Sequence, residues 1–210
     1  IRRQRQMCIR DRLFNTPLAP TDTRINVSVL NERPYVEITL RYLDEQGVIY
    51  QCSENMSWFD IKGGQSYKAI NKRVPADFSS ATFFFCAGAI LDGKITLQGL
   101  DFTDAQGDKA VVDILRHMGA DIQISGGNVT INRKRLTGGE FDLNAVPDSL
   151  PALAVTACFA ESPTRFYNVA QARLKETDRI AVMAEELRKL GATVQEYPDG
   201  MTHAIRIFLD

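Results

Sequence analysis

Several signatures of common catalytic sites are missing from this 210-residue sequence. There is no G-x-S-x-G nucleophile elbow, no H-E-x-x-H zinc motif and no glycine-rich fingerprint of a dinucleotide-binding fold. The only two histidines, His117 and His203, are far apart in the sequence, which argues against a zinc site. The missing motifs argue against an elbow-type serine hydrolase, a zinc protease of the H-E-x-x-H class and a Rossmann-type oxidoreductase.

Cysteine and long apolar runs are also scarce. The four cysteines, at positions 8, 52, 86 and 158, are widely separated, and none forms a C-x-x-C pair. Cys86 and Cys158 lie in apolar segments, where a free thiol behaves as a small hydrophobic group. No apolar run approaches the ~18 residues of a membrane-spanning helix. We therefore expect a cytoplasmic protein with no membrane partner.

The net charge of −1 gives no reason to expect nucleic acid as a partner, but the charge is unevenly distributed. Residues 1–12 carry five arginines and one acid, for a net charge of +4, so the remaining residues carry −5. The stretch QRQMCIRDR resembles translated sequencing-adapter read-through, and we expect residues 1–13 to be non-native. The alternatives are a native basic arm for phosphate or lipid, or an Arg-rich transit peptide.

A repeat organises the rest of the chain. Gly47, Gly119 and Gly191 are spaced by 72 residues, and each follows a helical pattern and precedes two strand patterns. Glycine after a helix is typical of the left-handed C′ position. The predicted helices are 35–46, 108–118 and 177–190, and the predicted strand pairs are 48–53 with 58–62, 121–125 with 128–132, and 193–197 with 202–208.

A second repeated landmark is an aspartate. Asp77 and Asp148 are 71 residues apart, and each follows a short strand-like segment and precedes a helix that is apolar on nearly all sides, 78–91 or 149–160. Strand patterns 94–100 and 164–170 follow. The repeat is therefore a βαβαββ unit in about two and a half copies, with buried helices inside and sheets outside around a common axis. A plain α/β sandwich is the alternative.

The densest polar cluster is the segment 173–179, RLKETDR. If a helix starts near Glu176, Lys175 and Arg179 project to the same side, although like charges there, and cations at a helix N-terminus, are locally unfavourable. A bound anion between the two cations would explain the pattern, with Arg173 as a third cation nearby. The alternative is an exposed surface with a Glu176–Arg179 ion pair.

Asp148 lies in the sequence VPDSLP and is predicted to be the N-cap of helix 149–160. The repeat places this helix beside helix 177–190, so Asp148 and Glu176 are expected to face one cleft. Two carboxylates together with two cations are suited to proton transfer on an anionic substrate.

Five segments resemble, in order along the chain, the 5-enolpyruvylshikimate-3-phosphate synthase family. They are NERPYVEITL at 31–40, KGGQSY at 62–67, DFSSATFF at 77–84, PDSLPALAV at 147–155 and LKETDRIAVMAEELRKLGA at 174–192. The resemblance implies an α/β enolpyruvyl-transferase fold, in which two domains each pack three βαβαββ units around buried helices as an inside-out α/β barrel. Residues 14–71 would be the C-terminal part of the first domain and 72–210 two of the three units of the second, incomplete at both ends.

The resemblance also implies a reaction. The enolpyruvyl group of phosphoenolpyruvate would be transferred to the 5-hydroxyl of shikimate 3-phosphate with release of phosphate, in the shikimate pathway of aromatic amino-acid biosynthesis, and neither a metal nor an organic cofactor is implied. Asp148 would bind the 5-hydroxyl and act as the base, and Glu176 would transfer a proton at the enolpyruvyl methylene. The implied substrate-binding residues include Lys175 and Tyr35 for shikimate 3-phosphate and Arg179 for phosphoenolpyruvate.

Two positions depart from the family pattern. Glu32 stands where the family often has serine, which puts shikimate-side contacts at that edge in question. Gln171 replaces a substrate-binding asparagine and can donate the same hydrogen bond. The family's N-terminal Lys-Ser loop, its Asn-Ala-Gly-Thr segment and its Asp-His-Arg segment have no counterparts. We therefore expect that the chain does not turn over substrate by itself. We also expect it to be a monomer.

There are three alternatives to this function. A UDP-N-acetylglucosamine 1-carboxyvinyltransferase shares the fold but would lack the K-E-T-D-R segment and carry a reactive cysteine loop. An RNA 3′-phosphate cyclase-like enzyme is disfavoured by the acidic charge of residues 13–210 and by the absence of a catalytic histidine motif. A non-catalytic binding or scaffolding repeat would leave Asp148 and the cationic segment unexplained.

Overall fold

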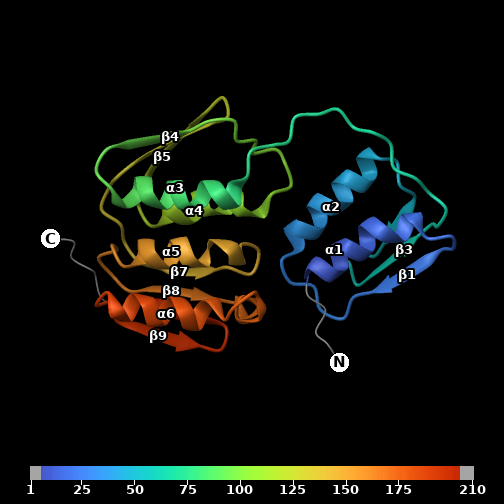
Figure 1. Cartoon of the computed structure of the whole chain (residues 1–210). Helices are drawn as coiled ribbons and strands as arrows, with labels where there is room; N and C mark the ends of the chain where they lie inside the picture. Colours follow the sequence, from blue (N-terminus) through green and yellow to red (C-terminus); the bar gives the residue numbers. More distant parts are fainter. Residues whose placement is uncertain (1–5, 204–210) are drawn as a thin grey trace. The chain divides into compact units, whose positions relative to one another are not determined.

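The computed structural model describes residues 6–203 and divides them into two compact units (Figure 1). The N-terminal unit comprises the described residues up to Val74 together with Asp104–Gln106. The C-terminal unit comprises Pro75–Thr103 and the described residues from Gly107 onward. Each unit has its own hydrophobic core and is described by itself.

The N-terminal unit packs two helices on a three-stranded antiparallel sheet of order β1-β3-β2. Its elements are α1 (Gln6–Asn15), the short 3₁₀ helix η1 (Thr16–Leu18), β1 (Thr23–Asn26), α2 (Arg33–Glu45), β2 (Tyr50–Cys52) and β3 (Trp58–Ile61). Helices α1 and α2 contact each other, and the core between them and the sheet is formed by Ile9, Leu13, Ile25, Val27, Val36, Leu40, Leu43, Val48, Met56, Phe59 and Ile61.

The C-terminal unit contains two successive copies of the repeat. The first copy consists of α3 (Phe78–Ile90), β4 (Lys94–Leu97), η2 (Gly107–Lys109), α4 (Ala110–His117), β5 (Asp121–Ser125) and β6 (Asn128–Asn132). The second consists of β7 (Glu140–Asp142), η3 (Pro147–Ser149), α5 (Leu150–Ala157), β8 (Thr164–Tyr167), η4 (Ala170–Leu174), α6 (Arg179–Lys189), β9 (Val194–Tyr197) and β10 (Gly200–His203). The remainder of the predicted strand 202–208 lies outside the described residues.

Each sheet is built from one continuous stretch of chain. The first copy forms the antiparallel sheet β4-β6-β5, and the second forms the sheet β7-β8-β10-β9, in which β7 and β8 pair in parallel. The second copy therefore has the predicted βαβαββ order. The first copy lacks its leading strand, because residues 62–77 contain no strand, so the prediction of a short strand before Asp77 is wrong.

The three glycines spaced by 72 residues end equivalent helices. Gly47, Gly119 and Gly191 follow α2, α4 and α6 with φ values of 71°, 100° and 91°. The N–H of Gly119 donates to the carbonyl of Arg116, and the N–H of Ala120 donates to the carbonyl of Leu115. Gly47 and Gly191, each with the residue after it, form the equivalent pair of bonds. This is the Schellman arrangement, which requires left-handed backbone and therefore favours glycine. The predicted helix ends are confirmed.

Helix α1 lies in register with the repeat, although residues 1–13 were expected to be non-native. Ile9, Ala81 and Leu153 are buried and lie 72 residues apart, and the same holds for Leu13, Phe85 and Ala157. Ile9 and Leu13 are buried in the core, and Arg10 Nε donates to Thr39 Oγ1 at 3.0 Å. This placement describes how the residues pack and does not test where they come from, so the non-native origin stays a prediction.

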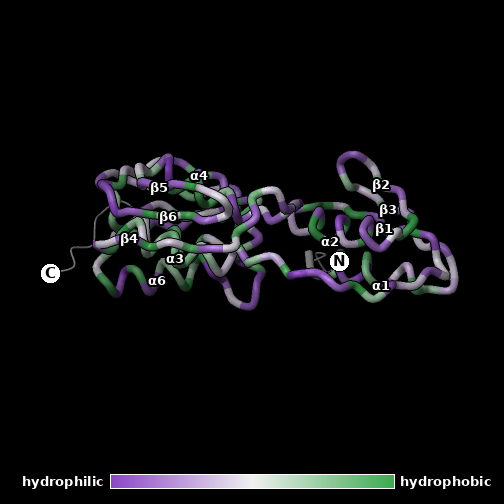
Figure 2. The backbone as a smooth tube through the Cα atoms, turned by 90° about the horizontal axis from the view of Figure 1, so that it is seen from above, coloured by the Kyte–Doolittle hydropathy of each residue, from purple (hydrophilic) through white to green (hydrophobic). Residues whose placement is uncertain are grey.

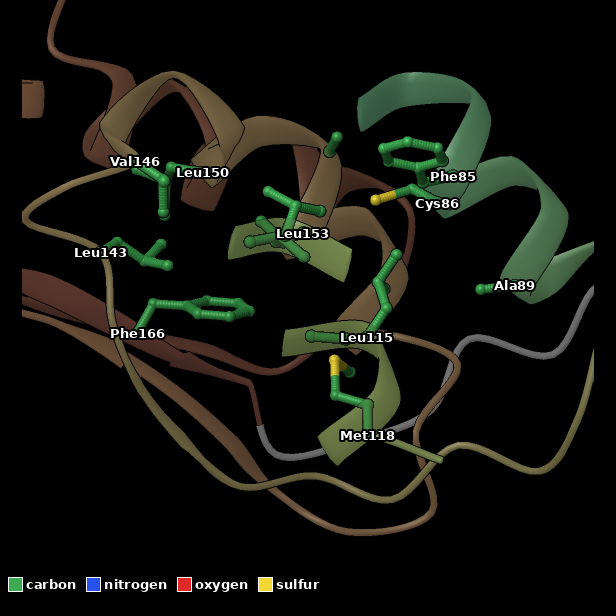
Figure 3. Close-up of a cluster of buried hydrophobic side chains, with 14 of the residues drawn as sticks. Phe85, Cys86, Ala89, Leu115, Met118, Leu143, Val146, Leu150, Leu153 and Phe166 are labelled. Carbon is green, nitrogen blue, oxygen red and sulfur yellow. The ribbon is translucent and has the colours of Figure 1, made fainter. Parts of the chain in front are cut away.

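The core of the C-terminal unit lies between its helices and sheets. Figure 1 shows α3 and α5 side by side, and these two helices are in contact. Figure 3 shows side chains from α3, α4, α5 and β8 meeting in this core, among them Phe85, Leu115, Leu153 and Phe166. The tube of Figure 2 changes between purple and green along α6, as expected for a helix with one apolar face.

Helix α3 departs from the expectation that it is buried on all sides. Phe78 and Phe85 are fully buried, but Phe83 and Phe84 are 56% and 55% exposed. The helix is 13 residues long, and no helix within residues 6–203 is both long and apolar enough to cross a membrane.

Candidate active site

The polar segment 173–179 leads into α6 and ends at its first residue, Arg179. The helix was expected to begin near Glu176, but it begins at Arg179, because the carboxylate of Asp178 caps it by accepting the N–H of Ala181 at 3.0 Å. Burial opposes the charge of Asp178, but the hydrogen bonds from Ala181 and Arg173 outweigh it and lower its pKa. Lys175 and Glu176 therefore lie in the non-helical segment that leads into α6.

The carboxylate of Asp148 lies between the two cations of this segment. Arg179 Nη1 donates to Asp148 Oδ1 at 2.7 Å, and Lys175 Nζ lies 3.4 Å from the same oxygen. The side chains of Arg179, Lys175 and Asp148 are 20%, 22% and 31% exposed, so this cluster is partly shielded from water. The sequence predicted an anion between Lys175 and Arg179, and in this structure the anion is a carboxylate of the protein itself.

Glu176 contacts the other edge of the same guanidinium. Arg179 donates from Nε to Glu176 Oε1 at 2.8 Å and from Nη2 to Oε2 at 3.0 Å, a bidentate pair. The pKa of Glu176 is lowered, first by its own backbone N–H and then by Arg179. Burial disfavours the charge on Arg179, but hydrogen bonds to Glu176 and Asp148 outweigh it and raise the pKa of the guanidinium. Arg179 thus joins the two carboxylates.

The predicted capping role of Asp148 is wrong. The N-cap of α5 is Ser149, with no side-chain cap, and Asp148 lies one residue earlier in the short 3₁₀ turn η3. Pro147 opens that turn, so Asp148 is placed before the helix rather than at its cap. Its side chain forms the charge-assisted contacts to Arg179 and Lys175.

Arg173 was expected as a third cation beside Lys175 and Arg179, but it does not join their cluster. Its Nε and Nη2 donate to the carbonyls of Pro198 and Tyr197 at 3.1 and 2.6 Å, and its Nη1 donates to Asp178 at 2.7 Å. Arg173 therefore ties the segment before α6 to the end of β9. Its role is to hold Asp178, the residue that sets where α6 begins.

The remaining predicted residues lie elsewhere. Gln171, in η4, donates from Nε2 to the carbonyl of Asn144 at 3.1 Å. Tyr35 belongs to the N-terminal unit, within the first turn of α2, and is half-buried. Glu32 caps the same helix with left-handed backbone (φ 56°) and is 2% exposed. The described units thus hold four of the predicted residues in one cluster: Asp148, Lys175, Glu176 and Arg179.

The cluster can hold an anion and move protons. A guanidinium and an ammonium face one carboxylate, so an incoming phosphate or carboxylate group would find two cations already positioned. Glu176 is exposed at 66%, so it is accessible to a bound ligand. An acid–base pair on either side of one arginine is suited to chemistry in which a proton is taken at one atom and delivered at another.

The fold agrees with that of solved enolpyruvyl transferases. An EPSP synthase from Acinetobacter baumannii superposes with a TM-score of 0.72 at 27% identity, over 92% of this chain and 45% of that one. The enolpyruvyl transferase NikO from Streptomyces tendae superposes with a TM-score of 0.65 at 20% identity, over 91% of this chain and 44% of that one. The chain thus has the enolpyruvyl-transferase fold expected from its sequence.

The family follows from the sequence comparisons. The protein-family model of EPSP synthase (3-phosphoshikimate 1-carboxyvinyltransferase) matches residues 11–207 of this chain. The 3-phosphoshikimate 1-carboxyvinyltransferase of Ruminiclostridium cellulolyticum is 53% identical over 189 residues, and that of Methanocaldococcus jannaschii is 40% identical over 187. These stretches cover 90% and 88% of this chain. The chain belongs to the EPSP synthase family, and it spans 44% and 43% of the length of these two relatives.

Proposed function

We propose that the protein to which this chain belongs transfers the enolpyruvyl group of phosphoenolpyruvate to the 5-hydroxyl of shikimate 3-phosphate. The 5-oxygen forms a bond to C2 of phosphoenolpyruvate while its proton leaves and C3 gains a proton, which gives a tetrahedral intermediate. In the second step C3 loses a proton and the bond from C2 to the phosphate oxygen breaks, which releases inorganic phosphate.

The residues of the cluster take the roles that the family resemblance assigns. Asp148 binds the 5-hydroxyl and accepts its proton, and Glu176 exchanges the proton at C3. The lowered pKa of Glu176 favours its ionised form, which is the form that removes a proton in the second step. Lys175 binds the phosphate of shikimate 3-phosphate and Arg179 holds phosphoenolpyruvate. Tyr35 and Gln171 are assigned to further substrate contacts.

One observation carries this proposal: a single guanidinium, that of Arg179, contacts both proposed catalytic carboxylates. Asp148 and Glu176 come from different elements, η3 and the segment before α6, and Arg179 donates to each at 2.7–3.0 Å. An arginine in this position is pre-organised to stabilise negative charge as it moves between the phosphate, the carboxylate and the reacting carbon.

The test uses a hybrid enzyme, in which the aligned 189 residues of the Ruminiclostridium cellulolyticum relative are replaced by those of this chain. We expect the hybrid to release phosphate from phosphoenolpyruvate only when shikimate 3-phosphate is present. Replacing shikimate 3-phosphate with UDP-N-acetylglucosamine should give no release. A folded hybrid that is inactive with shikimate 3-phosphate, or that uses the UDP-sugar instead, would overturn the proposal.

The partners and location form part of the same proposal. We expect the two substrates to be the only ligands required, with no metal or organic cofactor, and the enzyme to act as a monomer in the cytoplasm without nucleic acid or membrane. Gel filtration of the hybrid and retention of activity in the presence of EDTA are the corresponding measurements.

A further inference from the structure

A buried carboxylate that the proposed chemistry does not use lies at the start of α4. Asp108, in η2, is 2% exposed. It accepts a hydrogen bond from Ser79 Oγ on Oδ2 at 2.6 Å and another from Ser149 Oγ on Oδ1 at 3.2 Å. A buried carboxylate is costly unless it is hydrogen-bonded. Asp108 and the two serines therefore fix one another's positions.

The two serines are neighbours of the repeat-related aspartates. Ser79 lies in the first turn of α3, two residues after its N-cap Asp77, and Ser149 directly follows Asp148. One carboxylate therefore joins the N-terminal ends of the two inner helices, α3 and α5. Such an arrangement is electrostatically favourable, because the N-terminal end of each helix carries partial positive charge.

The link to Ser149 constrains the backbone on which Asp148 is carried. Pro147 and Ser149, on either side of Asp148, are both buried, and Ser149 is only 1% exposed. Its N–H donates to the carbonyl of Val146 at 3.1 Å, and its hydroxyl donates to Asp108. The backbone of Asp148 therefore cannot shift without moving one of these buried neighbours.

We propose that Asp108 is a positioning residue, which acts through Ser149 to hold the Asp148 carboxylate where a substrate hydroxyl meets it. This role rests on the proposed function, because it concerns the proposed base. The link from Asp108 to Ser79 lies at the other inner helix and reaches Asp148 only indirectly, through Asp108 itself. The two serine hydroxyls thus form a matched pair: each donates one hydrogen bond to the same carboxylate, but only one adjoins the proposed base.

The test compares Ser149→Ala with Ser79→Ala in the hybrid enzyme. We expect Ser149→Ala to lower kcat by about tenfold or more, since displacements of about 1 Å at a reacting group can cost that much, with the KM of either substrate changing less than threefold. Ser79→Ala should keep kcat within about twofold. Both variants should lower the thermal midpoint, because each deletes one hydrogen bond to the buried Asp108 carboxylate.

The outcomes separate positioning from general stability. Equal losses of kcat in the two variants, no loss in either, or a loss confined to KM would overturn the positioning role of Asp108. Asp108→Ala should reproduce the kcat loss of Ser149→Ala, and if that variant fails to fold, the serine pair still decides. If the unchanged hybrid is inactive, the proposed function fails, whereas an active hybrid with unaffected Ser149→Ala kinetics contradicts only the role of Asp108.

Discussion

Arg179 and Asp148 are joined by a 2.7 Å hydrogen bond between Nη1 and Oδ1, although they are 31 residues apart in the sequence. The bond connects the first residue of α6 to the turn before α5. It places a cation against a carboxylate at the point where two helices of one repeat begin. The predictions below test the cluster built around this bond and the stability of the units that hold it.

Replacing Arg179 with lysine should abolish most of the activity. Lysine keeps the charge but offers a single nitrogen in place of a planar fork, so it cannot reproduce the bidentate pair with Glu176 while also donating to Asp148. We expect kcat/KM of the hybrid to fall by about two orders of magnitude or more. Arg116→Lys, on the exposed side of α4, is the matched control and should change it less than twofold. Near-normal activity in Arg179→Lys would contradict the role of the guanidinium.

Glu176→Gln should lower kcat far more than it changes KM. Glutamine keeps the size and the contact to Arg179 but cannot carry a proton at the reaction pH. A loss of at least about 100-fold in kcat is expected for a residue that transfers a proton. Glu185→Gln, which removes an exposed pair with Lys189 on α6, is the control and should leave kcat unchanged. Equal rates in the two variants would exclude Glu176 from the chemistry.

The 210-residue chain alone should show no turnover. The family's Lys-Ser, Asn-Ala-Gly-Thr and Asp-His-Arg segments have no counterparts in the sequence, so substrate-binding groups of the family pattern are absent from it. A coupled phosphate-release assay with both substrates is the measurement. Shikimate 3-phosphate-dependent release by the purified chain would show that those segments are not required.

His203 should make the C-terminal unit less stable in acid. Burial lowers the pKa of this imidazole from 6.5 to about 4, so the folded chain binds its proton only well below the pH at which the unfolded chain does. The stabilisation is therefore complete above pH 6.5 and is lost as the pH falls toward 4, by up to about 3 kcal/mol. Urea unfolding at pH 7 and pH 4.5 measures the loss. His203→Phe should reduce the difference between the two pH values, and an unchanged difference would contradict the assignment.

Leu13→Ala should destabilise the N-terminal unit. Leu13, on α1, is fully buried in the core of this unit. Truncation of a buried leucine to alanine usually lowers the free energy of unfolding by about 2–5 kcal/mol. Leu18→Ala, at a side chain that is 53% exposed, should cost less than about 0.5 kcal/mol. Denaturant unfolding of both variants is the measurement. Equal stabilities would show that α1 contributes nothing to the core, as expected for a segment without a native role.

The fold could be predicted largely because its signals are local and repeated. Gly47, Gly119 and Gly191 mark helix ends through their own backbone requirements, which do not depend on distant residues. The start of α6 was placed three residues too early, because Glu176 and Asp178 are both acids suited to a helix start. Only the folded chain shows that Asp178 is the one that caps it.

The sequence predicted that Asp148, Lys175, Glu176 and Arg179 lie together, but not the geometry of their cluster. Lys175 and Arg179 were recognised because their local placement is unfavourable without an anion. The direction of the Arg173 side chain depends on the carbonyls of Tyr197, the last residue of β9, and Pro198, which lie 24 and 25 residues away, so the sequence does not reveal its structural role. Asp108 is the first residue of the predicted helix 108–118, where an acid is unremarkable, so only its partners in the folded chain distinguish it.

The construction of every sheet from one continuous stretch of chain has a consequence for how the protein folds. Within residues 6–203, strands β1–β3, β4–β6 and β7–β10 each pair inside their own segment, and none of the three sheets takes a strand from another segment of this range. Short sequence separation between pairing strands favours fast folding. Each sheet can therefore form as the ribosome releases its segment, and the docking of α3 against α5 follows once both helices have been released.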